Sequence, residues 1–155
     1  MKRNYRKGFT LIEMLAVLGI IVILSGLVFY SVSGFKNRQL LEAETRQVVA
    51  ILEEARSLTL SGQGGNVYGV HFLSNQIIRF AGSAYVGGAA GNVVYPLSSA
   101  VSLNSISFNG GGADVVFDKL KGTTLNFGSL DVALTSSAST KKTVFINSTG
   151  IIDTK

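Results

Sequence analysis

Gly8-Phe9-Thr10-Leu11-Ile12-Glu13 opens the stretch that decides the fold, and an apolar run continues from it to Tyr30. Within residues 9–30, Glu13 is the only charged residue. As a helix this run is about 33 Å long, enough to cross a bilayer core of about 30 Å. A carboxylate one turn inside such a helix costs about 2.5–3.5 kcal/mol, and the run holds no cation to pair with it. The sequence therefore predicts a membrane segment whose acid needs a partner from outside.

The residues before this run predict its orientation. Only Lys36 and Arg38 follow the run closely, whereas four basic residues precede Gly8, namely Lys2, Arg3, Arg6 and Lys7. The excess of positive charge favours a cytoplasmic N-terminus with the remainder outside. Two alternatives are a cleaved secretory signal, for which residues 31–33 offer small side chains, and a plain membrane anchor. A signal has an apolar core of about 7–15 residues, shorter than this run.

Composition argues against several functions. The net charge of +5 falls to +1 without residues 1–8, because Lys and Arg then number 10 against nine acidic residues. The basic character belongs to the leader, so an electrostatic footprint for nucleic acid is weak. Cysteine is absent and His71 is the single histidine, so we expect neither a disulfide framework nor a metal or cofactor site.

Beyond Tyr30 the pattern becomes that of an amphipathic helix. Apolar residues recur at three- and four-residue spacings, at Leu41, Val48, Ile51, Leu52, Ala55 and Leu58. The charged residues are expected on a solvated face, at Glu42, Arg46, Glu53 and Arg56. Gly62 is expected to end the helix. The spacing thus predicts one helix over residues 9–61, with an apolar half and an amphipathic half.

The remainder, residues 62–155, has the composition of a β domain. Short β-rich runs are predicted at 67–72, 76–80, 93–95, 101–108, 115–117, 123–127, 131–134 and 143–147. Glycine-rich or small polar segments separate them, including residues 109–112 and 136–140, which we expect to form loops. One long helix followed only by strands predicts an α+β fold, with an antiparallel sheet packed on the apolar stripe of the helix.

The polar residues of the β region do not form a catalytic pattern. Residues 62–65 are glycine-rich but follow a helix and lack the ending of a phosphate loop. His71 lies between apolar strand residues, which favours a partnered strand residue over a ligand. No set of acids, bases or nucleophiles has catalytic spacing, so we expect no enzyme. The one basic grouping of this region consists of Lys119, Lys121, Lys141 and Lys142, which are expected to scatter over the surface unless the fold brings them together.

Small residues recur along the apolar half of the helix. Gly19, Gly26 and Ser33 are seven residues apart and so lie on roughly one face. Small side chains let helices approach closely inside lipid. The spacing favours a helix that packs against copies or relatives of itself.

The combination of a basic leader, Gly8-Phe9, an embedded Glu13 and an apolar helix resembles the type IV prepilin family, which includes the pseudopilins of type II secretion. The resemblance implies that a prepilin peptidase cuts between Gly8 and Phe9 and methylates the new amino group of Phe9. It also implies a partner for Glu13, namely the freed Phe9 ammonium of a neighbouring subunit. Cofactors are not implied.

Looser similarity extends over the rest of the chain. Residues 54–58, 68–72 and 143–150 resemble the H-type minor pseudopilins, the GspH/FimT group. Many major pilins have a proline where this chain has Tyr30, and no proline interrupts residues 9–61, which favours a minor subunit. The implied parts are a cleaved leader (1–8), a transmembrane and assembly half (9–30), an amphipathic half (31–61) and an extracytoplasmic β-rich domain (62–155).

The leading hypothesis is a pilin-like structural subunit, held in the cytoplasmic membrane and then built into a pilus or a secretion pseudopilus at the cell surface. It would support secretion, adhesion, motility or DNA uptake. Its partners would be the peptidase, other pilins or pseudopilins, and the membrane. The alternative is a membrane-tethered binding module, in which Lys141 and Lys142 are the candidate contacts for an anion or for DNA.

Overall fold

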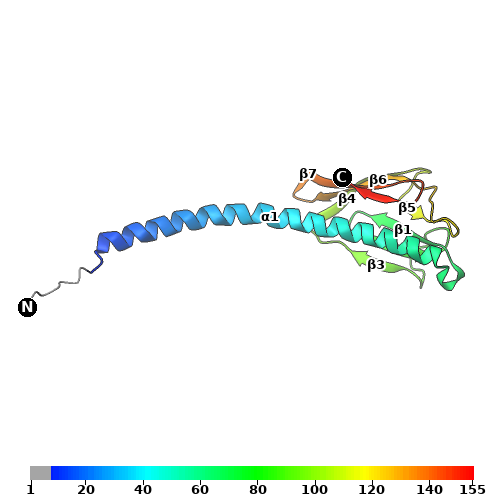
Figure 1. Cartoon of the computed structure of the whole chain (residues 1–155), viewed down its shortest axis with the longest axis horizontal. Helices are drawn as coiled ribbons and strands as arrows, with labels where there is room; N and C mark the ends of the chain where they lie inside the picture. The colour runs from blue at the N-terminus through cyan, green and yellow to red at the C-terminus, as the bar shows by residue number, and fades with distance from the viewer. Residues whose placement is uncertain (1–7) are drawn as a thin grey trace, which may run out of the picture. The chain divides into compact units, whose positions relative to one another are not determined.

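The computed structural model describes residues 8–155, and within them the side chains of residues 27–33 are left out of the description. This part of the chain forms one long helix and a short 3-10 turn followed by eight strands, which confirms the α+β fold (Figure 1). The elements are α1 (Leu11–Leu60), η1 (Gln63–Gly65), β1 (Tyr68–Leu73), β2 (Gln76–Ala81), β3 (Val93–Pro96), β4 (Val101–Phe108), β5 (Asp114–Val116), β6 (Gly128–Leu134), β7 (Ser137–Ile146) and β8 (Ile152–Thr154).

A side-chain cap at Thr10 and a left-handed glycine at Gly62 set the two ends of helix α1. At its start the hydroxyl oxygen of Thr10 accepts the N–H of Glu13 at 3.3 Å, the capping bond of a threonine at the N-cap. At its end Gly62 adopts a left-handed conformation (φ 65°), which glycine reaches without steric cost. The chain divides into two compact units, Met1–Arg38 and Gln39–Lys155, so α1 contributes to both.

The strands form two four-stranded sheets in which every pairing is antiparallel. The first has the order β3-β2-β1-β5 and the second the order β4-β6-β7-β8. Figure 1 shows both beside residues 39–60 of α1, with β6 and β7 on one side of the helix and β3 on the other. The antiparallel pairing was predicted, but the division into two sheets was not.

The strands of the β region differ from the prediction in three places. Residues 123–127 do not form a strand, because Thr124 makes only an isolated bridge to Phe117. Residues 137–140 were predicted as loop but begin β7, since ladder hydrogen bonds depend on the backbone and not on side-chain polarity. Strand β8 was missed because it has only three residues and follows a short turn closed by Gly150 (φ 78°).

The hydrophobic core lies between the amphipathic part of α1 and both sheets. The helix contributes Leu41, Val48, Ile51, Leu52 and Ala55, all from the predicted stripe. The sheets contribute inward-facing residues of alternating positions, including Val70, Phe72, Ile77, Val115, Leu103, Leu130, Val132, Val144 and Ile146. The core therefore belongs entirely to the Gln39–Lys155 unit.

Two of the predicted segments lie partly outside the residues and side chains that the structure describes. Residues 1–7 of the leader lie outside them, and the predicted span 9–30 ends among side chains that are not described. Where the structure is described, none of its helices combines the length and the apolar character that crossing a membrane requires.

Candidate functional site: the exposed start of the long helix

The Gly8–Phe9 peptide bond lies just before α1. The Thr10 cap fixes Leu11 as the first helical residue, and the Thr10 carbonyl accepts the N–H of Met14 at 3.2 Å. Gly8 and Phe9 are therefore non-helical, and both are exposed, with 82% of Phe9 accessible. A protease needs an accessible bond, and the Gly8–Phe9 bond is flanked by exposed residues outside the helix.

Glu13 lies in the first turn of α1 and is exposed. Its backbone N–H is bound by the cap, and its carboxylate makes no ion pair or hydrogen bond with any described residue. The positive end of the helix dipole favours an anion at this position. The structure thus gives Glu13 a helical site that suits its charge and leaves its carboxylate open to an external cation.

The surface around Glu13 is apolar on all sides. Twelve large apolar side chains before residue 25 are between 48% and 82% exposed, namely Phe9, Leu11, Ile12, Met14, Leu15, Val17, Leu18, Ile20, Ile21, Val22, Ile23 and Leu24. A soluble monomer rarely exposes an apolar surface larger than a few hundred Å², and larger ones mark a protein or membrane contact. This surface therefore requires lipid or other helices to cover it.

Gly19 and Gly26 interrupt this surface with small residues. Apart from the neighbouring backbone of the helix itself, no described atom lies within 4 Å of the position where a side-chain carbon would start at either glycine. Both sites are open, so the local packing of the described chain does not account for glycine at these positions. Ser33, the third residue of the predicted series, lies among the side chains that are not described.

Lys141 and Lys142 are adjacent on β7 and point to opposite faces of the second sheet. Lys141 binds Asp131 on the outer face, with 2.7 Å between Nζ and Oδ2. Lys142 is paired in register with the core residue Val132 and binds Glu42 of α1 on the inner face. Alternation along a strand enforces this separation. The two lysines therefore do not form a joint anion site.

Each of these two lysines lowers the pKa of the carboxyl group that it binds. The hydrogen bonds from Lys141 and then Thr143 hold the pKa of Asp131 below its ordinary value. The hydrogen bond from Lys142 likewise lowers the pKa of Glu42.

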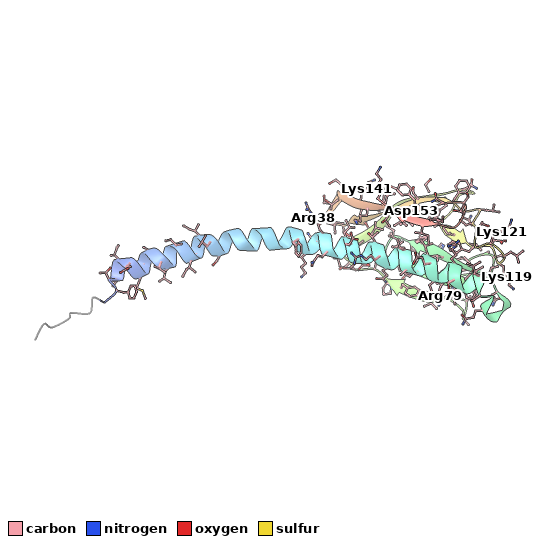
Figure 2. The ribbon with its side chains drawn as sticks, viewed as in Figure 1. Arg38, Arg79, Lys119, Lys121, Lys141 and Asp153 are labelled. Atoms are coloured by element: carbon pink, nitrogen blue, oxygen red, sulfur yellow. The ribbon has the colours of Figure 1, made fainter. Side chains whose placement is uncertain are left out.

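The predicted scatter of the remaining basic residues agrees with their positions. Figure 2 shows Lys119 and Lys121 at one end of the β domain and Lys141 at the other. Lys119 donates to the carbonyl of Gly65 at 2.9 Å, which anchors the loop after β5 to the turn after α1.

His71 is a partnered strand residue, as predicted. Its Nδ1 lies 2.5 Å from Oδ1 of Asp114 across the β1–β5 pair, and its ring stacks on Tyr85 with 4.0 Å between centroids. No group of three or more metal-ligating side chains occurs among the residues that the structure describes.

Three buried polar positions on α1 were missed by the sequence interpretation, namely Glu44, Thr45 and Thr59. Glu44 is only 8% exposed and accepts the N–H of Ser98 at 3.1 Å, while its second oxygen is buried without a partner in the described chain. Thr59 is fully buried and binds the backbone of Tyr68. Glu44 follows Leu41 by three residues and Thr59 follows Ala55 by four. This helical spacing places both on the buried face of α1 and could have predicted their burial.

One predicted surface residue is wrongly placed. Arg56 was expected on the solvated helix face, but it is half-buried and its Nε donates to the carbonyl of Gly122 at 2.9 Å. A long side chain can cover apolar surface while its charged end finds a polar partner, which helical spacing alone does not reveal. Glu42 and Arg46, which were also expected on that face, form an ion pair one helical turn apart, with 3.3 Å between Oε1 and Nε.

Comparison with known proteins bears on the start of the chain. Residues 3–29 match the family model described as the prokaryotic N-terminal methylation motif. Neither the curated proteins nor the solved structures yielded a match. The matched residues include the exposed Gly8–Phe9 bond, Glu13 and most of the exposed apolar surface. The chain thus carries a prepilin-type N-terminal motif, which supports a type IV pilin-like structural subunit rather than an enzyme.

Proposed function

We propose that this chain is a minor pilin-like subunit of the H type, processed between Gly8 and Phe9, methylated on the Phe9 amine and assembled through the first part of α1. The observation that carries the proposal is the Glu13 carboxylate, which has no partner in the described chain and lies within an apolar surface that needs covering. The methylation motif over residues 3–29 supports the same processing.

The assembly step follows from the cost of isolated charges. Removal of the leader leaves a new ammonium group at Phe9, beside exposed apolar side chains. An ammonium and a carboxylate are each costly in an apolar environment, and pairing offsets much of that cost. When two α1 helices stack in a filament, the Phe9 ammonium of one subunit meets Glu13 of its neighbour, which fixes register and direction.

Before assembly, the same segment holds the subunit in the cytoplasmic membrane. The four basic residues before Gly8 favour a cytoplasmic N-terminus and an extracytoplasmic β domain. Gly19 and Gly26, whose surroundings are open, are proposed to let neighbouring helices approach closely. The absence of proline from residues 9–61 favours the minor role.

Replacing Glu13 tests the proposal. Glu13→Ala removes the carboxylate but not the cap, because Thr10 binds the backbone N–H of residue 13. We expect normal leader removal and loss of the variant from sheared filaments or from pseudopili formed on overexpression. Glu13→Gln, which keeps size but not charge, should fail in the same way.

The matched control is Glu54→Ala, which removes another exposed helical carboxylate, one that pairs with Arg79 at the surface, and should assemble normally. Normal incorporation of Glu13→Ala would contradict the assembly role of Glu13. Failure of Glu54→Ala to the same extent would show that the defect is not specific to the Glu13 carboxylate.

A further inference from the structure

Strand β8 has an unpaired edge. It is the last strand of the second sheet, and β7 is its only strand neighbour in the described chain. Thr143 and Lys155 exchange two backbone hydrogen bonds, at 3.0 and 2.9 Å. Because bonded and non-bonded pairs alternate along an antiparallel ladder, the odd-numbered residues of β8 bond to β7. The N–H and C=O groups of Ile152 and Thr154 therefore point away from the sheet.

The other three sheet edges are each blocked at one position or more. Strand β3 ends in Pro96, which has no N–H to offer. At β5, Asn126 accepts the N–H of Val116 at 3.3 Å and Thr124 donates to its carbonyl. At β4, the outward N–H of Leu103 is bound by a carbonyl of the β1–β2 turn at 2.9 Å. Native proteins generally block exposed edges in such ways or keep them short and charged. Strand β8 is short and carries Asp153, but the outward N–H and C=O groups of Ile152 and Thr154 have no partner in the described chain.

A groove runs beside this edge, between β8 and α1. It has a volume of about 520 Å³ and is lined by Glu42, Thr45, Arg46, Val49, Ala50, Glu53, Ile152, Asp153 and Thr154. Its middle is apolar, with Val49, Ala50 and Ile152, and charged residues lie around it. All of these residues belong to the Gln39–Lys155 unit. The volume is within the range of sites that bind small ligands or a few peptide residues.

The charges around the groove are mainly negative. Arg46 is paired with Glu42, which Lys142 also binds. Glu53 is exposed and has no ion-pair partner among the described residues. Asp153 is paired in register with Phe145, and both lie on the outer face of the sheet because the flanking Val144 and Ile146 are buried on the inner face. A strand added beside β8 would thus meet one carboxylate on each of its two faces.

We propose that β8 and this groove bind an extended, basic segment of a partner protein, which adds a fifth strand to the second sheet. Backbone groups of Ile152 and Thr154 bond to the added strand, and its alternate side chains lie over α1 or beside Asp153. Lysine or arginine at these positions pairs with Glu53 or Asp153. In such strand addition, backbone bonds supply affinity and side-chain positions supply specificity. The proposal does not depend on processing at Gly8 or on the role of Glu13.

The test uses the full-length chain in detergent micelles and a labelled peptide of about six residues, an ordinary strand length, with alternating lysine and valine. Fluorescence anisotropy measures its binding to wild type, Thr154→Pro and Thr154→Val. Proline removes an outward N–H that β7 does not use, whereas valine keeps it. We expect Thr154→Val to bind like wild type and Thr154→Pro to bind about tenfold more weakly.

Two further measurements keep the proposal testable if Thr154→Pro folds poorly. In wild type, the peptide should slow amide hydrogen exchange at Ile152 and Thr154. Glu53→Lys should weaken binding of the lysine–valine peptide and strengthen binding of a matched glutamate–valine peptide. Glu53→Gln should weaken binding of the lysine–valine peptide without strengthening that of the glutamate–valine peptide. No binding by wild type, unchanged exchange at both amides, or equal binding of the two peptides would overturn the proposal.

Discussion

The Thr59 hydroxyl is predicted to be a main link between the end of α1 and the start of the β domain. Its oxygen accepts the N–H of Tyr68 at 2.8 Å and donates to the carbonyl of Ala55 at 2.9 Å. The Thr59 side chain is fully buried. Thr59→Val keeps the shape of the side chain but leaves the Tyr68 N–H without its acceptor. An unsatisfied buried donor costs about 1–3 kcal/mol, and because Tyr68 is half-buried we expect about 1.5 kcal/mol.

Thr45→Val is the matched control on the same helix. Thr45 is 2% exposed, and its hydroxyl donates only to the carbonyl of Leu41, at 2.7 Å. That carbonyl keeps its helical hydrogen bond after the substitution, and such back-bonding contributes little to helix stability. We expect a change of less than about 0.5 kcal/mol in Thr45→Val. The difference in unfolding free energy between Thr59→Val and Thr45→Val therefore measures the hydrogen bond from the N–H of Tyr68 in β1 to the Thr59 hydroxyl.

Urea unfolding followed by near-ultraviolet circular dichroism measures both variants, because the domain tyrosines report its packing. The free energy of unfolding is obtained by linear extrapolation. Thr59→Val should also melt roughly 5–10 °C below wild type. If Thr59→Val and Thr45→Val have the same stability, the link between α1 and β1 does not contribute as argued.

Two other predictions concern the β domain. Asp131→Asn should cost about 1 kcal/mol at neutral pH, a low value because Lys141 is half-exposed. The lowered pKa of Asp131 means that its contribution is present above its ordinary value of 3.8 and is lost as pH falls through the folded value. Urea midpoints of variant and wild type should therefore converge in acid, and a constant difference would contradict this. Gly150→Ala should cost more than about 1 kcal/mol, because Gly150 has φ 78° and an added carbon would lie 2.9 Å from Nε of Arg56. If Gly150→Ala melts at the same temperature as wild type, an added side chain does not strain the backbone at residue 150.

The helix was largely predictable because its signals are local. The apolar run that begins at Phe9 and the stop at Gly62 predicted a helix over residues 9–61, which differs from Leu11–Leu60 by two residues at one end and one at the other. The polar residues on the buried face were not predicted. Glu44 and Thr59 are buried because Ser98 and Tyr68 supply their hydrogen bonds from distant parts of the chain.

The strands were predictable only where one face is apolar. The bounds of β4, with Val101 and Leu103 facing the core, agree fully with the prediction. The polar start of β7 and the three-residue β8 depend on pairing with neighbouring strands, which is not encoded in local composition. Residues 123–127 have β composition but use the side chains of Thr124 and Asn126 to bind the edge of β5.

The start of the helix shows how far sequence can define a site. Glu13 was identified because a lone acid in an apolar run is physically costly, whereas the Gly8–Phe9 bond was identified from the resemblance to the prepilin family. The structure adds that this bond is exposed and that the Glu13 carboxylate lacks a partner in the described chain. The lysine pair was misleading, since adjacent residues on a strand face opposite ways, and Lys141 and Lys142 bind different carboxylates.

Mass spectrometry of the protein purified from cells that make a prepilin peptidase tests the central claim most directly. The account predicts that wild type begins at Phe9 and carries one methyl group on its amine. Gly8→Leu, which places a bulky side chain at the cleavage site, should keep the whole leader. A wild-type protein that retains residues 1–8, or one cut elsewhere, would contradict the account.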